Sequence, residues 1–200
     1  RSNDRDNSDR HITRVSRFVD ALLPSVNRWK AAEVHFNCSA SYTHHWPLLK
    51  CEPDWYSQLE ALDVMIPYDV SGIDTTRQSH HIGDLAILRA PSLKKVVVDR
   101  WRFSWSIPPS WSQLKELEVA KRIDQAIMIS ILAACPNLLK LKIDIYKADS
   151  NPPITSPIGY LVQHPLTSLS VTFYLLSHFS EIRLPETPAL QTLSLSNKSV

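Results

Sequence analysis

The chain has 200 residues, of which 44% are hydrophobic, and a formal net charge of +2 from 22 basic and 20 acidic side chains. This length and apolar content suffice for one folded domain, or one run of repeats, with a substantial core. The nearly balanced charge is far from the basic excess of nucleic-acid-binding surfaces. The composition therefore favours a folded chain that does not bind nucleic acid.

The cysteines and the apolar segments bear on the cellular compartment. Cys38, Cys51 and Cys135 are an odd number in a long chain, which argues against a disulfide framework and for a reducing environment. The sequence has neither an apolar stretch of membrane-spanning length nor a signal-peptide pattern at its start. We therefore expect an intracellular protein, cytoplasmic or nuclear, that does not associate with membranes.

The first part of the chain changes character near residue 12. The opening segment RSNDRDNSDR has no apolar side chain, so residues 1–11 are expected to be a flexible lead-in. Apolar residues then fall at helical spacing until Pro24. This pattern predicts an amphipathic helix over residues 12–24.

One phrase organises the rest of the chain: an apolar residue, two variable residues, a second apolar residue, one variable residue, and Val, Ile or Leu. Six clear copies begin at Leu59, Leu93, Leu114, Leu138, Leu166 and Leu190, and a weaker copy begins at Trp29. Self-similarity at intervals of about 20 to 50 residues indicates a solenoid or a propeller. Because side chains alternate along a strand, positions four and six share an apolar face, and positions three and five share a mostly polar one.

The segments between the copies should return the chain so that the next strand is parallel to the last, and such crossovers commonly carry a helix. The segment IDQAIMISILAA is predicted to be such a helix, with a stripe formed by Ile123, Ile127, Ile131 and Ala134. Pro136 would stop it. Prolines two residues before the first Leu of a copy mark the margin of a strand, where the missing amide hydrogen is tolerated.

Aligning the copies predicts which polar side chains become neighbours. Lys95, Glu116 and Lys140 would form a ladder of alternating charge, and Glu118 would lie beside Lys142. These five side chains are candidate partner contacts. The alternative is that the charges merely neutralise one another, since exposed pairs stabilise a protein by only about 0–1 kcal/mol.

The phrase Leu-x-x-Leu-x-Leu resembles the strand signature of leucine-rich repeats over residues 29–200. More narrowly, RWKAAEVHF from Arg28, APSLKKVVV from Ala90, WSQLKELEV from Trp111 and AACPNLLKLKI from Ala133 resemble the repeat region of F-box-like proteins of mushroom-forming fungi. The resemblance implies an α/β fold, an irregular leucine-rich-repeat solenoid with a parallel sheet on the concave side and helices or loops on the convex side. It also implies the substrate-binding region of an SCF-type ubiquitin-ligase receptor, whose upstream F-box, not present here, would dock on the ligase adaptor.

The chain departs from regular leucine-rich repeats two residues after each strand, where an Asn is expected. The residues at this position are Pro67, Trp101, Arg122, Tyr146, Tyr174 and Lys198. We therefore expect no Asn ladder and an irregular curvature. The last copy ends at Leu195 without a polar cap, so we expect the natural protein to continue and this chain to expose an apolar edge.

An aromatic segment, RWRFSWSIPPSW, extends from Arg100 to Trp111. Its rings either pack beneath a return loop or contribute to a protein interface, where Trp and Arg often dominate the binding energy. Binding of single-stranded nucleic acid by stacking is a further alternative, which two arginines support only thinly. The candidate partner contacts in this segment are Trp101, Arg102, Phe103 and Trp105.

Patterns for catalysis and metal binding are weak. Three scattered glycines do not form a phosphate-binding loop, and Glu116 and Glu118 would share the solvated face of one strand. Two thiols and two imidazoles could ligate zinc, but without the usual closely spaced cysteine pair; they are Cys38, His44, His45 and Cys51. We therefore predict no cofactor and no metal.

The resulting hypothesis is a non-catalytic module that recognises a protein partner. One alternative is an α/β enzyme, such as a barrel, with its site at the strand ends. Barrel strands are apolar on both faces, as only Val96, Val97 and Val98 are here. The other alternative is a structural or assembly repeat protein unrelated to ubiquitin.

Overall fold

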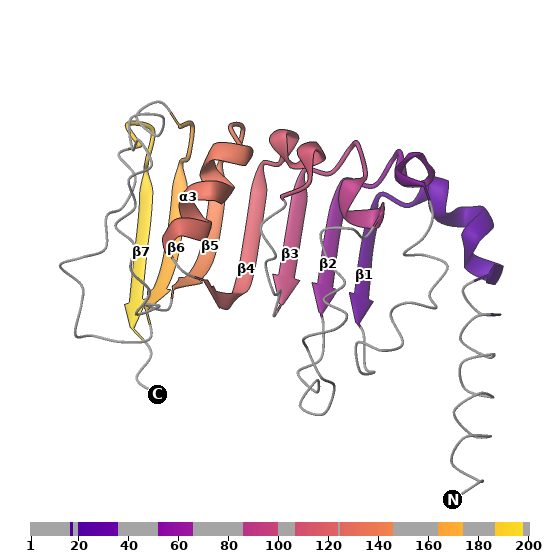
Figure 1. The fold of residues 1–200 in the computed structure, drawn as a ribbon, viewed down its shortest axis with the longest axis horizontal. Helices are drawn as coiled ribbons and strands as arrows, with labels where there is room; N and C mark the ends of the chain where they lie inside the picture. The colour runs from indigo at the N-terminus through magenta and orange to yellow at the C-terminus, as the bar shows by residue number, and fades with distance from the viewer. Residues whose placement is uncertain are drawn as a thin grey trace, which may run out of the picture.

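The structure is a computed structural model that describes residues 17, 20–35, 52–65, 86–99, 107–123, 125–145, 164–173 and 187–197. Within these ranges, seven strands lie side by side in one sheet (Figure 1). They are β1 Ala31–His35, β2 Ala61–Met65, β3 Lys95–Asp99, β4 Glu116–Ile123, β5 Lys140–Ile145, β6 Ser168–Phe173 and β7 Thr192–Asn197. Every neighbouring pair is parallel, and the spatial order follows the chain.

Each copy of the repeated phrase forms a strand that begins at its third position, and the weak copy from Trp29 forms β1. The predicted α/β class with a parallel sheet is therefore confirmed. The predicted register is confirmed as well, since Leu117 pairs with Leu141 and Leu141 with Leu169. The strand order is linear, with β1 and β7 at the two edges, so the sheet formed by the described strands is open and not closed into a barrel.

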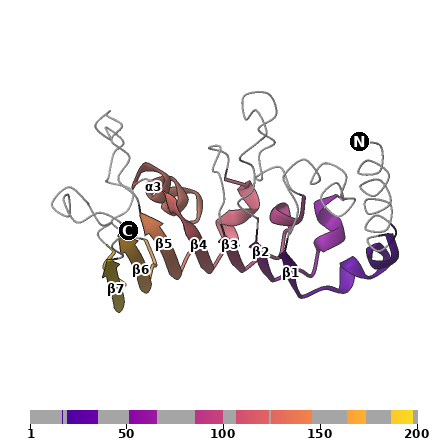
Figure 2. The same cartoon turned by 90° about the horizontal axis from the view of Figure 1, so that it is seen from below.

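The described helices that follow β1 in the chain lie on one side of the sheet, and the helical segment at residues 20–28 lies beyond the β1 edge (Figure 2). Four of those described are short 3-10 helices: η1 Leu23–Arg28, η3 Pro53–Tyr56, η5 Ala86–Arg89 and η6 Pro109–Gln113. The longer helix is α3 Gln125–Ala134, which crosses from β4 to β5. Proline occupies the first turn of η1, η3 and η6, where its fixed φ is compatible with helix and its missing N–H is not needed.

Two boundaries differ from the sequence prediction. The helix expected from Ile123 begins at Gln125, because Ile123 is the last residue of β4 and pairs with Ile145. A register shift between Val119 and Arg122 accompanies this longer strand. Of the helix expected over residues 12–24, the described part is helical up to Leu22 and then continues as η1, with Pro24 in its first turn.

The core fills the space between the sheet and the helices. Positions one, four and six of each phrase from β2 to β6 are buried there, together with the residue three positions before the phrase in most units. In those units, the N–H of the first residue donates to the carbonyl of that earlier residue, as from Leu59 to Tyr56 at 3.0 Å and from Leu138 to Cys135 at 3.0 Å. A tight turn thus places two buried side chains before each strand begins.

Two hydrogen-bond ladders join successive units ahead of the strands. The carbonyl of the second phrase residue accepts two N–H groups of the next unit, as Lys94 does from Lys115 at 2.7 Å and Glu116 at 2.9 Å. Side chains form the second ladder. Its members are Ser92 Oγ to Ser57 O at 2.5 Å, Gln113 Nε2 to Pro91 O, and Asn137 Nδ2 to Ser112 O at 2.9 Å. Polar cross-links between units are therefore present ahead of the strands.

Candidate functional site

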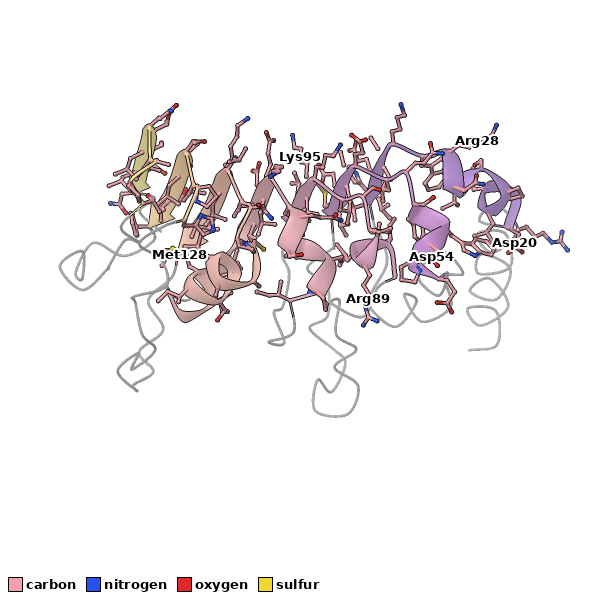
Figure 3. The ribbon with its side chains drawn as sticks, turned by 90° about the horizontal axis from the view of Figure 1, so that it is seen from above. Asp20, Arg28, Asp54, Arg89, Lys95 and Met128 are labelled. Atoms are coloured by element: carbon pink, nitrogen blue, oxygen red, sulfur yellow. The ribbon has the colours of Figure 1, made fainter. Side chains whose placement is uncertain are left out.

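The side of the sheet opposite the helices carries the predicted partner contacts. Figure 3 shows Lys95 on this side, with Asp54, Arg89 and Met128 on the helical side. We call this surface the open face, and its central part is lined by Lys95, Val97, Glu116, Glu118, Lys140, Lys142, Ser168 and Ser170. These are positions three and five of the phrase, which alternation along each strand directs away from the core.

The predicted charge ladder is confirmed in the centre of the open face. Glu116 lies between two lysines, with Lys140 Nζ 2.7 Å from its Oε1 and Lys95 Nζ 3.7 Å from its Oε2. Lys142 Nζ lies 2.6 Å from Glu118 Oε1. The hydrogen bond from Lys140, partly opposed by burial, lowers the pKa of Glu116 below its usual value of 4.5.

These ion pairs are weak because their side chains remain largely in contact with water. The lysine of each pair is exposed, and the Glu116 side chain is 34% exposed. Such pairs stabilise the fold by about 0–1 kcal/mol, less at high salt. Replacing the partner of one of these charges should therefore change the free energy of folding only slightly.

The ion pairs border a shallow groove of about 230 Å³. Val97 lies in this groove, between Asp63 and Glu118 in the register, and it is half-buried. Strand β3 is apolar on both faces, as the sequence indicates, but Val97 on the open face is only half-buried, whereas Val96 and Val98 are fully buried on the helical side. A small apolar surface thus lies beside the charged pairs.

The chemistry of the open face changes from one end of the sheet to the other. At the β1 end, Glu33 is in register with Asp63, and its carboxylate lies 2.6 Å from His35 Nε2. At the β7 end, the face carries hydroxyl groups, among which Ser196 Oγ donates to Thr172 Oγ1 at 3.0 Å. The face therefore offers acidic, ion-paired and hydroxyl-bearing sections in order along the stack.

The aromatic segment is described only at its C-terminal end. Trp111 is fully buried, and its Nε1–H donates to the carbonyl of Leu88 at 3.0 Å, which also accepts from Ser110 Oγ at 3.3 Å. Trp111 thus packs in the core. The four candidate contacts of this segment lie outside the described residues; they are Trp101, Arg102, Phe103 and Trp105.

Sequence reasoning missed a buried polar group at the turn before β6. His164 is buried, and its Nε2 lies 3.0 Å from the carbonyl of Cys135, just beyond the end of α3. Burial lowers the pKa of His164, while the carbonyls of Cys135 and Leu132 act in the opposite direction. The only sequence signal was its place two residues before Leu166, where a unit turns towards its strand.

Neither a metal site nor a membrane-spanning helix is found among the described residues. The cysteines and histidines that form a possible zinc ligand set lie outside this part of the chain: Cys38, His44, His45 and Cys51. Cys135 is a buried free thiol, and burial raises its pKa to about 12. At neutral pH this thiol is therefore protonated and unreactive.

Comparisons with protein-family models, with curated proteins and with solved structures find no match to this chain. The resemblance to fungal F-box-like repeat regions therefore stays a prediction from the sequence motifs. The α/β architecture, by contrast, follows from the parallel register of the seven strands.

Proposed function

We propose that this chain is a leucine-rich-repeat recognition module that binds another protein on its open face and catalyses no reaction itself. The observation that carries the proposal is that a parallel sheet has helices on one side and paired charges and hydroxyls on the other. Parallel sheets in α/β enzymes are covered on both faces. The described residues leave the opposite face of this sheet polar and exposed, which supports a binding surface there.

Because the ion pairs of the open face are weak, their charged side chains can pair with charges on a bound protein instead. A carboxylate on a bound protein can take Lys140 from Glu116, and a partner cation can take Glu118 from Lys142, at little cost in fold stability. The fixed order of charges across β3, β4 and β5 would then select partners with the complementary order. Val97 adds an apolar contact within the same groove.

The biological setting that we propose is a substrate receptor of an SCF-type ubiquitin ligase. The support for this setting is the resemblance of the repeat motifs to fungal F-box-like proteins. In that setting the protein held on the open face is the one to be ubiquitinated, and the adaptor binds through an F-box outside these residues. The partner should then accumulate when the gene for this protein is deleted.

The test compares partner capture from the native host by three forms of the protein. Lys140→Glu combined with Lys142→Glu reverses the two lysines, and we expect captured partners to bind at least about tenfold more weakly. Arg89→Glu makes the same charge reversal, per residue, on the helical side and should bind as the wild type does. Equal loss in both variants, or no loss in the first, would rule out the open face as the binding surface.

A further inference from the structure

Exposed lysine side chains gather where the three central strands of the sheet begin. We call them the strand-start lysines: Lys94 just before β3, Lys95 at its first residue, Lys115 just before β4, and Lys140 at the first residue of β5. The structure describes the turns that lead into these strands, and it describes β2 and β6 on either side. This surface therefore lies inside the described sheet and not at either of its edges.

The backbone holds these lysines on neighbouring strands. The carbonyl of Lys94 accepts the N–H of Lys115 at 2.7 Å, and the carbonyl of Lys115 accepts the N–H of Lys140 at 2.9 Å. Neighbouring strands lie about 4.8 Å apart, so β3 and β5 are separated by only about 10 Å. The four charges are therefore close enough to act on one short segment of a bound chain.

Carboxylates neutralise only part of this positive charge. Glu116 is shared by two of the strand-start lysines, whose Nζ atoms lie 2.7 Å and 3.7 Å from its carboxylate oxygens. Lys94 Nζ lies 3.2 Å from Glu60 Oε1, whereas Lys115 makes no ion pair with any described residue. Four ammonium groups thus face two carboxylates, which leaves two positive charges in excess.

Apolar and hydroxyl-bearing side chains border the strand-start lysines. Leu139 is 36% exposed, and its N–H donates to the carbonyl of Lys115 at 2.8 Å. The groove of the open face adds the half-buried Val97 and, at its β6 end, the hydroxyls of Ser168 and Ser170, which can donate to a carboxylate. This surface therefore complements a segment that carries both carboxylates and apolar side chains.

We propose that the strand-start lysines bind an acidic segment of the partner protein, in which apolar side chains accompany the carboxylates. The proposal rests on the proposed function, because it names the part of the partner that the open face holds. A carboxylate pairs most readily with Lys115, where it displaces no carboxylate of this chain, and a neighbouring apolar side chain contacts Leu139. At the β1 end, Glu33 and Asp63 would repel the same segment, so it lies over β3 to β5.

The charge excess favours an acidic protein segment over a nucleic acid. Proteins that bind DNA commonly make about six to ten phosphate contacts, far more than two excess charges can supply. Exposed apolar side chains at Leu139 and Val97 add contacts that a sugar-phosphate backbone does not use. A lysine-rich or arginine-rich segment would meet like charge.

Fluorescence anisotropy with labelled synthetic peptides tests the proposal on the 200-residue chain. A peptide that alternates glutamate pairs with single leucines should bind in roughly the micromolar to millimolar range, and more weakly at high salt. A peptide with lysine in place of each glutamate, and a single-stranded oligonucleotide of equal negative charge, should bind at least about tenfold more weakly. Absence of binding by the acidic peptide, or equal binding by either comparison probe, would overturn the proposal.

Substitutions at the strand starts locate the binding surface. Lys94→Glu combined with Lys115→Glu should weaken binding of the acidic peptide at least about tenfold, and Lys94→Gln combined with Lys115→Gln should weaken it less. Arg28→Glu combined with Lys30→Glu is the matched control, because it makes the same charge change at exposed residues ahead of β1.

Circular dichroism checks the fold of each variant. If the glutamate pair does not fold, the glutamine pair must show the loss by itself. Unchanged binding in the folded lysine variants, or an equal loss in the control, would contradict a site at the strand starts.

Peptide binding and partner capture from the host separate this proposal from the proposed function. If capture depends on Lys140 and Lys142 but the acidic peptide does not bind, the open face binds a partner by another kind of segment, and only the present proposal fails. If capture is independent of those two lysines, the proposed function fails, whatever the peptide does.

Discussion

Strands β5 and β7 carry the same phrase and the same alternation, yet their apolar faces differ in burial. Leu141 is 2% exposed in β5, whereas Leu193, at the equivalent position of β7, is 47% exposed. Strand β5 lies between two strands beneath α3, whereas β7 pairs only with β6 among the described strands. The phrase therefore sets the strand and its face, but burial comes from the strands and helices on either side.

The largest expected effect separates these two leucines directly. Leu141→Ala removes a fully packed side chain and should lower the free energy of unfolding by about 2–5 kcal/mol. Leu193→Ala makes the same chemical change at the edge and should cost less than about 1 kcal/mol. Urea denaturation of both variants at low protein concentration checks this difference, and equal losses would contradict the described burial.

A second pair extends the comparison to tryptophans. Trp111→Phe leaves space in the core and removes the N–H that donates to Leu88, so we expect a loss of about 1–3 kcal/mol. Trp55 is 46% exposed in η3, and Trp55→Phe should change stability by less than about 0.5 kcal/mol. Thermal unfolding followed by circular dichroism distinguishes the two outcomes; a larger effect at Trp55 would place the core elsewhere.

The buried His164 makes the interior of the stack sensitive to acid. Its pKa is lowered from 6.5 in the folded state, so the unfolded chain binds the extra proton more readily. Its neutral form therefore stabilises the fold above about pH 6.5, and stability falls as the pH drops from there through the folded pKa. Stability curves between pH 5 and pH 8 should show this fall in the wild type and a smaller one in His164→Gln; parallel curves would contradict it.

The smallest expected effect concerns the ion pairs of the open face. The pKa of Glu116 is lowered in the folded state, so its ionised carboxylate stabilises the fold above about pH 4.5. This stabilisation is lost as the pH falls through the folded pKa. Because the side chain is partly exposed, a double-mutant cycle of Glu116→Gln with Lys140→Met should give a coupling of about 0–1 kcal/mol. High salt should reduce this coupling, and a coupling above about 2 kcal/mol would mean that the pair is buried.

The sequence was sufficient where a feature depends on alternation within one strand. The strands, their register and the Lys140–Glu116 contact all follow from positions three to six of the phrase. The sequence was insufficient where contacts with adjacent strands determine a residue's secondary structure or burial. Ile123 has helical spacing with Ile127, but pairing with Ile145 holds it in β4, and Val97 has an apolar side chain on the polar face.

The connections were also harder to predict than the strands. Most described returns are 3-10 helices of four to six residues, too short to show an apolar period. The ladder formed by Ser92, Gln113 and Asn137 depends on the stacking of turns far apart in the chain. Three different residue types serve the same purpose there, so no single letter marks the position.

The central claim is that successive phrases form adjacent parallel strands of one open sheet. Pulsed electron paramagnetic resonance tests it with one spin label at Glu33→Cys and a second at Glu118→Cys, Ser170→Cys or Ser194→Cys, diluted with unlabelled chain and in a background without Cys38 and Cys51. These positions share one row of the register, at three, five and six strand steps. The account predicts distances that increase in that order, at roughly 14, 24 and 29 Å before the length of the label. Distances that do not increase along the series, or that place Ser194 near Glu33, would contradict it.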